Sequence, residues 1–553
     1  VRAHAYVPND PLFAGQWFLK GAQPSAIRAD TAWDSTRGGA SPSASTVVVA
    51  VLDTGVRFDH PDLGRAAAGG KLLPGYDFVS ADAGGLFATA NDGNAWDADP
   101  SDPGDYLTAT DLANEPFKGT GCGNDGSDDQ PVDSSWHGTR VAGLIAAGTD
   151  NGIGIAGAGF NIRVLPVRVL GRCGGYDSDV LAGMYWAAGM TLPPPLVMTV
   201  PPTNPNPAQV INMSLGGTGP CTELYAAAVK DITAFGVLVV VSAGNEGTAV
   251  DSPANCVGAV AVAGLRHAGT KVGYSNLGPE VAIAAPAGNC LLIGVNDPCV
   301  YSLDTTTNTG KTTPSTSTYT DQFRANIGTS FSSPIVAATV GLMKAVNPRL
   351  TPSQLVARLK SSARAFPASS DTLPSPPACV SPAVSPDQGS ECVCNTQFCG
   401  AGMLDTSAAV AAALRPTAVA QATGVIGANR TLTLDGTGSG AAINRSLTGY
   451  QWSVFSTSGG ASTPVISNAN QATASVLSPS TGSYTLQLVV TDNTGATDSA
   501  QVSVTAATSG GGTDSTNPPP TANGNSGGGA VSALTLCALA LLTFIAVRRR
   551  RRA

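Results

Sequence analysis

The chain has 553 residues, which is enough for two or more domains with their own hydrophobic cores. Hydrophobic residues make up 42% and charged residues only 12%, beside 65 glycines and 39 prolines, a composition that excludes a disordered chain and is typical of a loop-rich secreted protein. The formal net charge is −8 although five arginines, Arg548 to Arg552, stand near the end, and such an acidic body argues against nucleic acid as the main partner.

A mixed, polar N-terminal segment, residues 1–45, precedes a regular alternation of apolar runs and Ala-rich stretches. The apolar runs predict short strands, and the Ala-rich stretches have helical spacing. Strands are expected over 47–52, 163–169, 209–213, 237–241 and 257–262, and helices over 139–147, 180–188 and 224–234. This alternation favours an α/β domain over residues 46–414, with a parallel sheet flanked by helices. Residues 191–207, with seven prolines, predict an irregular loop.

The pattern changes after Arg415. Residues 416–507 show period-two strands separated by turn signals, which predicts an all-β sandwich. Its Leu-Asp-Gly turn, Tyr-x-Trp strand and Leu-x-Leu-Val-Val-Thr-Asp-Asn strand resemble the PKD domain, an Ig-like module. Residues 508–529 are rich in Gly, Ser, Pro and Asn and predict a flexible linker.

The last segment, residues 530–553, has the composition of a membrane anchor. Residues 530–547 contain no charge, and the arginines follow at once. Eighteen helical residues span roughly 27 Å, which is enough to cross a bilayer, so we expect a transmembrane segment with its arginines in the cytoplasm. The alternative is a buried core helix.

Cysteine usage indicates an oxidising compartment. Of eleven cysteines, Cys537 lies inside the apolar span, and the other ten are an even number spread through loops, which favours a disulfide framework. Zinc at Cys392, Cys394 and Cys399 is the alternative, but the spacing is not that of a zinc ribbon and no histidine is near. Spacing does not determine the pairing; we predict the pairs Cys122–Cys173, Cys221–Cys256, Cys290–Cys299, Cys379–Cys392 and Cys394–Cys399.

Three residues that together suit nucleophilic catalysis stand at the ends of predicted elements. Asp53 ends the first apolar run, where a buried carboxylate needs a partner. His137, one of only four histidines, stands at the start of an Ala-rich stretch. Ser330 lies in a small-residue turn before an apolar helix over 335–343. A serine needs a histidine to take its proton, and the histidine needs a carboxylate to fix its tautomer, so the three predict a catalytic triad.

A fourth residue could stabilise the negative charge that acyl transfer develops. Asn245 follows the apolar run 237–241 in a Gly-rich turn, so we expect its side-chain amide to point into the same cleft as an oxyanion donor. The backbone N–H of Ser330 is the second candidate donor.

These residues lie in five segments that resemble motifs of the subtilisin-like serine proteases, the subtilases. The segments are Val51–Gly55, His137–Thr139, Ile211–Gly217, Gly244–Asn245 and Gly328–Ser330, in the order Asp, His, Ser that subtilisin has. The resemblance covers about residues 8–411 and implies hydrolysis of polypeptide substrates through an acyl-enzyme. It also implies that Ser214, Leu215 and Gly216 pair with the substrate backbone as an added β-strand.

Two positions depart from the family's usual motifs. Arg140 stands where a second histidine is usual, and Phe331-Ser332 replace a Met-Ala pair after the serine. Neither departure alters the triad or Asn245. The alternative function from another class is a catalytically inactive surface binding protein that uses the sandwich domain, and the intact triad argues against it.

Two calcium sites are expected, one from the residue composition and one from the resemblance to subtilases. An Asp-rich stretch that includes the turn-forming residues Pro100 and Gly104 could fold around Ca²⁺. The carboxylates of this first site are Asp97, Asp99, Asp102 and Asp105. The alternative is a solvated acidic loop. The resemblance implies the second site, with ligands from side chains or backbone carbonyls of Asp10, Asp62, Asn151, Ile153 and Ile155.

The resemblance further implies a signal peptide and an inhibitory propeptide outside this chain, with residues 1–6 as the end of the propeptide or the mature start. The Gly-rich stretch before the apolar span is similar to C-terminal sorting tails of Gram-negative bacteria, so we expect secretion or display at the surface of such a cell. A permanent membrane anchor is the alternative. We expect a monomer.

Overall fold

The computed structural model describes residues 5–39, 46–194, 196, 200–292, 302–320, 327–427 and 430–506. The chain divides into two compact units, residues 1–414 and 415–553. The predicted linker and the predicted transmembrane segment lie outside the described residues. Among the helices that are described, none is long and apolar enough to cross a membrane.

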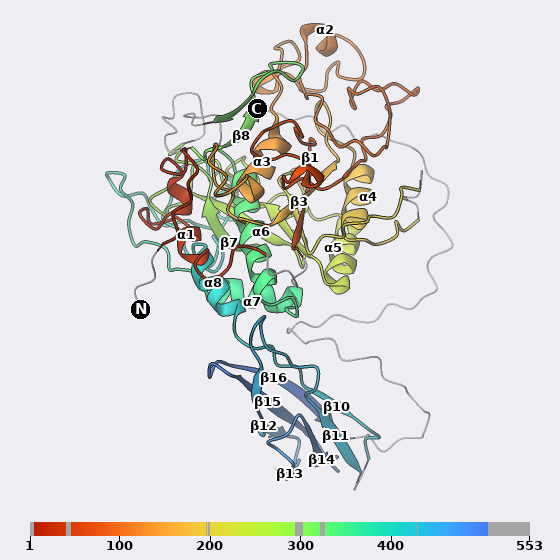
Figure 1. Ribbon diagram of the computed structural model, residues 1–553, viewed down its shortest axis with the longest axis vertical. Coiled ribbons are helices and arrows are strands. Elements are labelled where there is room, and N and C mark those ends of the chain that lie inside the picture. The colour runs from red at the N-terminus through yellow and green to blue at the C-terminus, as the bar shows by residue number, and fades with distance from the viewer. Residues whose placement is uncertain are drawn as a thin grey trace. The chain divides into compact units, whose positions relative to one another are not determined.

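The first unit is built on a seven-stranded parallel sheet, as the sequence predicts (Figure 1). Its strand order is β2-β3-β1-β4-β5-β6-β7. The strands are β1 (Val48–Asp53), β2 (Tyr76–Asp77), β3 (Arg163–Arg168), β4 (Val210–Met213), β5 (Leu238–Ser242), β6 (Val260–Leu265) and β7 (Val281–Pro286). All five predicted runs form strands of this sheet, and β2 and β7 are additions that the sequence analysis did not predict. A separate antiparallel pair is formed by β8 (Thr305–Asn308) and β9 (Ser317–Thr320).

Helices cover both faces of the sheet. Helix α6 (Thr329–Val346) runs along the sheet (Figure 1) and packs with α3 (His137–Ala146) on one face. Helices α4 (Asp177–Ala187) and α5 (Glu223–Phe235) cover the other face. The remaining helices of this unit are α1 (Ala29–Ala32), α2 (Ala109–Leu112), α7 (Pro352–Ser361), α8 (Thr406–Ala413) and the short 3₁₀ turns η1 (Trp17–Leu19), η2 (Ala66–Ala68) and η3 (Asn124–Gly126).

Strand β1 shows why these strands are continuous apolar runs. Val49 and Val51 belong to the core cluster that contains α3 and α6. Ala50 and Leu52 belong to the opposite cluster, with α4 and α5. Because successive side chains of a strand point to opposite faces and both faces are covered, every position of β1 is buried.

The disulfide prediction is confirmed for the four pairs that lie in described residues: Cys122–Cys173, Cys221–Cys256, Cys379–Cys392 and Cys394–Cys399. Cys290 is also disulfide-bonded, and its predicted partner Cys299 lies outside the described residues.

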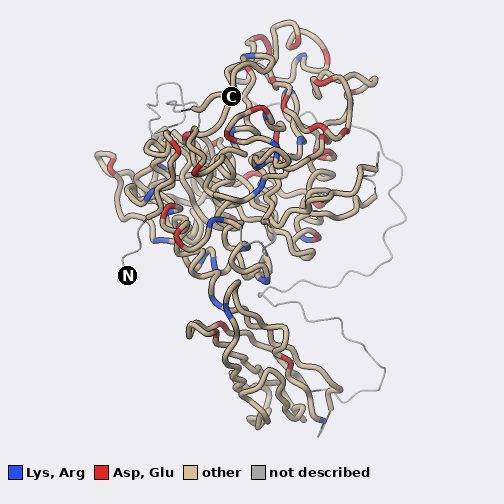
Figure 2. The backbone as a smooth tube through the Cα atoms, in the orientation of Figure 1, with Lys and Arg blue, Asp and Glu red and all other residues tan. Residues whose placement is uncertain are grey.

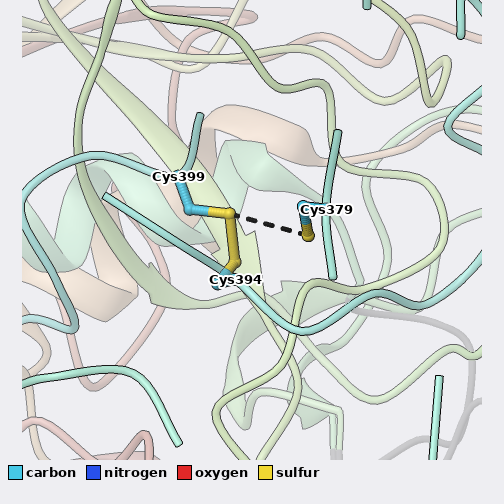
Figure 3. A group of neighbouring side chains, drawn as sticks. All are labelled: Cys379, Cys394 and Cys399. Atoms are coloured by element: carbon cyan, nitrogen blue, oxygen red, sulfur yellow. Dashed lines mark hydrogen bonds between the residues drawn. A yellow bond between two sulfur atoms is a disulfide. The ribbon is translucent and has the colours of Figure 1, made fainter. Parts of the chain in front are cut away.

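Three cysteine sulfurs lie close together, and their bonding distinguishes a disulfide framework from a zinc site. Figure 3 shows Cys379 beside the Cys394–Cys399 disulfide, with the Sγ atoms of Cys379 and Cys399 3.9 Å apart. The three sulfurs lie within 4.8 Å of one another, which is close enough for a metal site. Zinc binds cysteine as the thiolate. Each of these sulfurs forms a disulfide bond, so none of the three is a thiolate that could bind zinc.

The second unit is the predicted β-sandwich. One sheet has the order β10-β11-β14-β13 and the other β12-β15-β16, with antiparallel pairing throughout. Side chains of β15 alternate between buried and half-buried positions, and the core is centred on Trp452, Leu486 and Leu488. The strands are β10 (Gln421–Thr423), β11 (Thr431–Asp435), β12 (Leu447–Ser458), β13 (Ile466–Ser467), β14 (Thr473–Leu477), β15 (Ser483–Asp492) and β16 (Thr497–Thr505).

Asp492 stabilises the turn between β15 and β16. Its carboxylate accepts hydrogen bonds from the backbone N–H and the hydroxyl of Thr494 (2.9 and 2.7 Å), from the N–H of Ala496 (3.0 Å) and from the Arg445 guanidinium (2.9 Å). Burial alone would raise the pKa of Asp492, but the donors from Thr494 and Arg445 outweigh it and lower the pKa to about 2.

We therefore expect Asp492→Asn to destabilise the sandwich by about 2 kcal/mol at pH 7. Because the folded-state pKa is depressed, this stabilisation is present above pH ~4 and is lost as the pH falls toward about 2. Hydrogen exchange of the β15 amides in the full chain, at pH 7 and at pH 2, measures it. Asp435→Asn is the control, since that carboxylate hydrogen-bonds Thr437. Equal losses of protection for both variants at pH 7 would contradict this assignment.

Candidate functional site

Asp53 and His137 form a hydrogen-bonded pair at one edge of the sheet. Asp53 is the last residue of the interior strand β1 and is fully buried. His137 is the first residue of α3, and its Nδ1 lies 2.8 Å from Oδ1 and 3.0 Å from Oδ2 of Asp53. Because a carboxylate can only accept, Nδ1 carries the hydrogen and Nε2 is the nitrogen left to act as a base.

This pairing determines the protonation behaviour of His137. Burial by itself would lower the pKa of the imidazole, but the charge of Asp53 and its hydrogen bond outweigh burial, so the pKa of His137 is raised. An imidazolium that forms at this position is thereby stabilised.

Ser330 lies at the N-terminus of α6, next to the segment that follows β4. Gly328 precedes the helix with φ of 147°, a backbone conformation that favours glycine. The Ser330 hydroxyl donates to the carbonyl of Ser214 (3.3 Å), and the Ser214 hydroxyl donates to the carbonyl of Ser330 (2.7 Å). Two of the predicted site segments are therefore in direct contact.

Asn245 is oriented by the same helix end. Its Oδ1 accepts from the backbone N–H of Thr329 (2.8 Å) and from the Thr329 hydroxyl (3.0 Å). This leaves the Nδ2 hydrogens as the donors of the amide. A Cβ built on Gly328 would lie 3.7 Å from both Asn245 Nδ2 and the backbone N of Ser330, so the two predicted oxyanion donors border the same small space.

The two departures from the subtilase motifs have specific contacts. The ring of Phe331 lies 5.7 Å from the ring of His137, centroid to centroid, and is itself buried. Arg140 donates from Nε to the Thr307 hydroxyl on β8 (3.2 Å). In the sequence, Phe331 stands out only as a departure from the motif, and its contact with His137 arises from the tertiary structure.

The four carboxylates predicted to share a calcium ion do not gather in one group among the described residues. Figure 2 shows the acidic residues spread along the loops around α2. Asp97 accepts from the Asn94 amide and from the N–H of Asp99, while Asp99 accepts from the N–H and hydroxyl of Ser101.

Asp102 and Asp105 support the start of α3 instead. Asp102 accepts from the Thr54 hydroxyl (2.7 Å), which in turn accepts from the N–H of Gly138 (3.0 Å). Asp105 accepts from the N–H and hydroxyl of Ser135 at 2.6 and 2.7 Å, and the same hydroxyl accepts from the N–H of His137 (3.2 Å). Burial, with the nearby charge of Asp105, raises the pKa of Asp102 to about 7.

The other predicted calcium ligands are brought together. Asp10 accepts from the backbone N–H groups of Asp150 (2.8 Å) and Asn151 (3.2 Å). Asp62 accepts from the Asn151 amide (2.7 Å) and from the N–H of Ile155 (3.0 Å). Both carboxylates are buried, and burial raises the pKa of Asp62 to about 6, with the charge of Asp10 adding to the effect. The loop 150–155, which includes Ile153, therefore wraps two buried carboxylates.

Glu246 and Asn276 are supporting residues that were not predicted from the sequence. The Glu246 carboxylate accepts from the backbone N–H of Asn245 (2.8 Å) and from the Asn276 amide (3.0 Å). Asn276 Oδ1 accepts from the N–H groups of Glu246 and Thr248. Together they fix the turn that presents Asn245. The proximity of Glu246 to Asn245 is visible in the sequence, but the role of Asn276 depends on a contact with a segment about 30 residues away.

Comparisons with known proteins agree with this geometry. Residues 44–390 match the model of the peptidase S8 domain, described as the subtilase family, and residues 423–506 match the model of a PKD domain. The chain is similar to an extracellular protease of Xanthomonas campestris pv. campestris, with 37% identity over 410 residues that cover 74% of this chain and 57% of the relative.

An extracellular basic protease of Dichelobacter nodosus is 35% identical over 350 residues, 63% of this chain and 50% of that protein. The chain thus spans about half the length of the curated relatives it matches. Among solved structures, a protease from Pseudoalteromonas arctica PAMC 21717 is similar, with a TM-score of 0.58, 38% identity and coverage of 73% of this chain and 99% of that one.

The Asp53–His137 pair predicts a specific titration. By NMR, we expect the pKa of His137 to lie above 6.5 and to fall in Asp53→Asn, because the carboxylate is what raises it. Since the folded-state pKa is raised, the pair stabilises the fold most below pH 6.5, and this contribution is lost as the pH rises through the raised value.

His60 is the internal control, because burial lowers its pKa. Its titration should stay below 6.5 in both proteins. A His137 pKa that Asp53→Asn leaves unchanged would contradict the pairing.

Proposed function

Because the chain belongs to the subtilase family, we propose that it is a secreted serine endopeptidase that hydrolyses peptide bonds through an acyl-enzyme intermediate. The observation that carries this proposal is the hydrogen bond of His137 to the buried Asp53 carboxylate, beside the helix end that presents Ser330. Secretion is supported by the disulfides and by relatives that are named extracellular proteases.

In the proposed mechanism, the Ser330 hydroxyl attacks the carbonyl carbon of the substrate. His137 takes the serine proton at Nε2 as general base and later donates it to the leaving amine. Asp53 keeps the hydrogen on Nδ1 and stabilises the imidazolium during the step. Water then hydrolyses the acyl-enzyme by the same proton transfers in reverse, which restores Ser330.

The oxyanion of the tetrahedral intermediate would be bound by Asn245 Nδ2 and the backbone N–H of Ser330. Two features position these hydrogen-bond donors before the reaction. Thr329 and Glu246 hold the turn that carries Asn245, and the first N–H groups of α6 have no partner within the helix. Fixed donors at the N-terminal end of a helix stabilise developing negative charge without reorganisation.

The substrate backbone would pair with Ser214, Leu215 and Gly216. These residues follow β4, and the Ser214 carbonyl lies next to the Ser330 hydroxyl. An extended polypeptide added along this segment would bring its carbonyl to the nucleophile. Peptides are therefore the proposed substrate class.

We also propose a structural calcium ion at Asp10 and Asp62. The residues fit because two buried carboxylates with raised pKa values need a cation to stay ionised together. Asn151 and the carbonyls of Ile153 and Ile155 would complete an oxygen set of the kind that calcium prefers. The ion would stabilise the loop 150–155 and takes no part in the proton transfers.

An activity-based fluorophosphonate probe tests the catalytic proposal. We expect covalent labelling of the wild-type protein at Ser330, and no labelling of Ser330→Ala. Asp53→Asn should lower kcat about 10⁴-fold, because the imidazole loses its tautomer. Measurements use a fluorogenic peptide and the same protein preparations.

Ser332→Ala is a matched control, since this neighbouring hydroxyl donates to the carbonyls of Ala285 and Pro286. It should keep the label. Absence of label on wild type, or equal label on Ser330→Ala, would instead favour an inactive binding protein.

EDTA tests the calcium proposal. Removal of the ion should lower Tm by about 5 °C, and added calcium should restore it. Asp62→Asn should have a reduced Tm that EDTA no longer changes, whereas Asp97→Asn should retain the EDTA response. The same EDTA shift in both variants would exclude the Asp10–Asp62 site.

A further inference from the structure

The chain between β6 and β7 contacts the turn that carries Asn245, one of the two proposed oxyanion donors. The carbonyl of Tyr274, in this connection, accepts from the N–H of Gly247 (2.8 Å). Two residues further on, the N–H of Asn276 donates to the carbonyl of Gly244 (3.1 Å). The turn is therefore held from one side by backbone hydrogen bonds, which do not depend on the rotamer of a side chain.

The side chain of Tyr274 reaches the segment that carries the other proposed donor. Its hydroxyl accepts from the N–H of Gly328 (2.9 Å) and donates to the carbonyl of Ala287. The N–H of Gly328 also donates to that carbonyl (3.0 Å). Gly328 is the N-cap of α6 and stands two residues before Ser330. These hydrogen bonds therefore fix the backbone from which the Ser330 N–H projects.

Tyr274 makes these contacts away from water, whereas Asn245 is exposed. Tyr274 is 7% exposed and belongs to a small apolar cluster. The cluster consists of Tyr274, Val272, Ala287 and Cys290, with Ile327 packed against it. A hydrogen bond in such surroundings is stronger than an exposed one, because the local dielectric constant is low. The bond between Gly328 and Tyr274 thus restrains the start of α6 without any exposed side chain.

We propose that Tyr274 is a positioning residue for the oxyanion site, and that it holds the Asn245 amide and the Ser330 N–H at a fixed separation. This inference rests on the proposed function, since the two donors matter only if Ser330 attacks a carbonyl carbon. The carbonyl of Tyr274 is bonded to the turn that presents one donor, and its hydroxyl is bonded to the helix start that presents the other. In this role Tyr274 does not touch the substrate.

A fixed separation matters because the oxyanion exists only in the transition state and the tetrahedral intermediate. Donors that are already in place stabilise the developing charge without reorganisation. Thr329 joins the same two segments directly, through its N–H and hydroxyl to Asn245 Oδ1, but that link includes an exposed side chain. The buried link through Tyr274 restrains the backbone of both segments.

The expected effect of losing this link is moderate. Removal of a whole oxyanion donor typically lowers kcat about 100- to 1,000-fold. Loss of the Tyr274 hydroxyl leaves both donors present and removes only their restraint. One hydrogen bond corresponds to about 3- to 10-fold in rate.

Tyr274→Phe tests the inference because it removes the hydroxyl and keeps the ring. We expect kcat for a fluorogenic peptide to fall about 3- to 10-fold, with KM unchanged. The affinity for a peptide aldehyde, whose reversible adduct with Ser330 places an oxygen between the donors, should fall by the same factor. Both values are expressed per site that the fluorophosphonate probe labels to completion, which removes the effect of any unfolded fraction.

A double-mutant cycle tests whether Tyr274 acts through the oxyanion site. In the Asn245→Ala background, one of the two donors whose separation Tyr274 fixes is gone. Tyr274→Phe should therefore change kcat less than about 2-fold in that background.

Tyr185→Phe is the matched control. It also removes a buried tyrosine hydroxyl, which donates to Asp231 (3.1 Å) in the core cluster on the face of α4 and α5. Because this hydroxyl has no contact with either donor segment, the variant should keep the wild-type kcat and aldehyde affinity per labelled site.

Two results would overturn the inference and leave the proposed function intact. One is a Tyr274→Phe variant with wild-type kcat and wild-type aldehyde affinity per labelled site, whatever its Tm, which would make the hydroxyl a support of the fold alone. The other is the full effect of Tyr274→Phe in the Asn245→Ala background. If wild type neither reacts with the probe nor hydrolyses the peptide, both the proposed function and this inference are wrong.

Discussion

The interaction on which the site depends is the hydrogen bond between the buried carboxylate of Asp53 and the imidazole of His137. A carboxylate at the end of the interior strand β1 has no access to water and requires a donor. His137 meets this requirement only if α3 begins at that residue. Asp102, through Thr54, and Asp105, through Ser135, then hold the first turn of α3. The acidic stretch thus supports the histidine.

The parallel sheet explains how distant segments reach this pair. Carboxyl ends of parallel strands lie along one edge, so the residues after β1, β4 and β5 become neighbours. Helix α6 packs under the sheet and begins at the same edge, which brings Ser330 against Ser214. Covered faces keep the strands rigid, and rigid strands fix the side chains at their ends to the accuracy that acyl transfer needs.

Loops without regular structure are held by covalent and polar contacts. The Cys221–Cys256 disulfide joins the loop after β4 to the loop after β5. The adjoining disulfides of Cys379 and Cys399 stabilise a loop that has little secondary structure. A buried lysine, Lys271, donates to the carbonyls of Gly273 and Gln388 and ties the same loop to the sheet. Such contacts explain how a chain rich in Gly and Pro can keep a defined site.

The sequence by itself determined which elements form and which residues end them. Apolar runs buried on both faces specify parallel strands, and Asp53, His137, Asn245 and Ser330 are recognisable because each stands at a boundary in a motif. Four of the predicted disulfide pairs are confirmed, although cysteine spacing alone does not determine the pairing. Tertiary structure alone decided the contacts across long sequence separations. It directed Asp102 and Asp105 to the start of α3 and placed Phe331 against His137. These contacts depend on where loops cross in space, which local pattern does not encode.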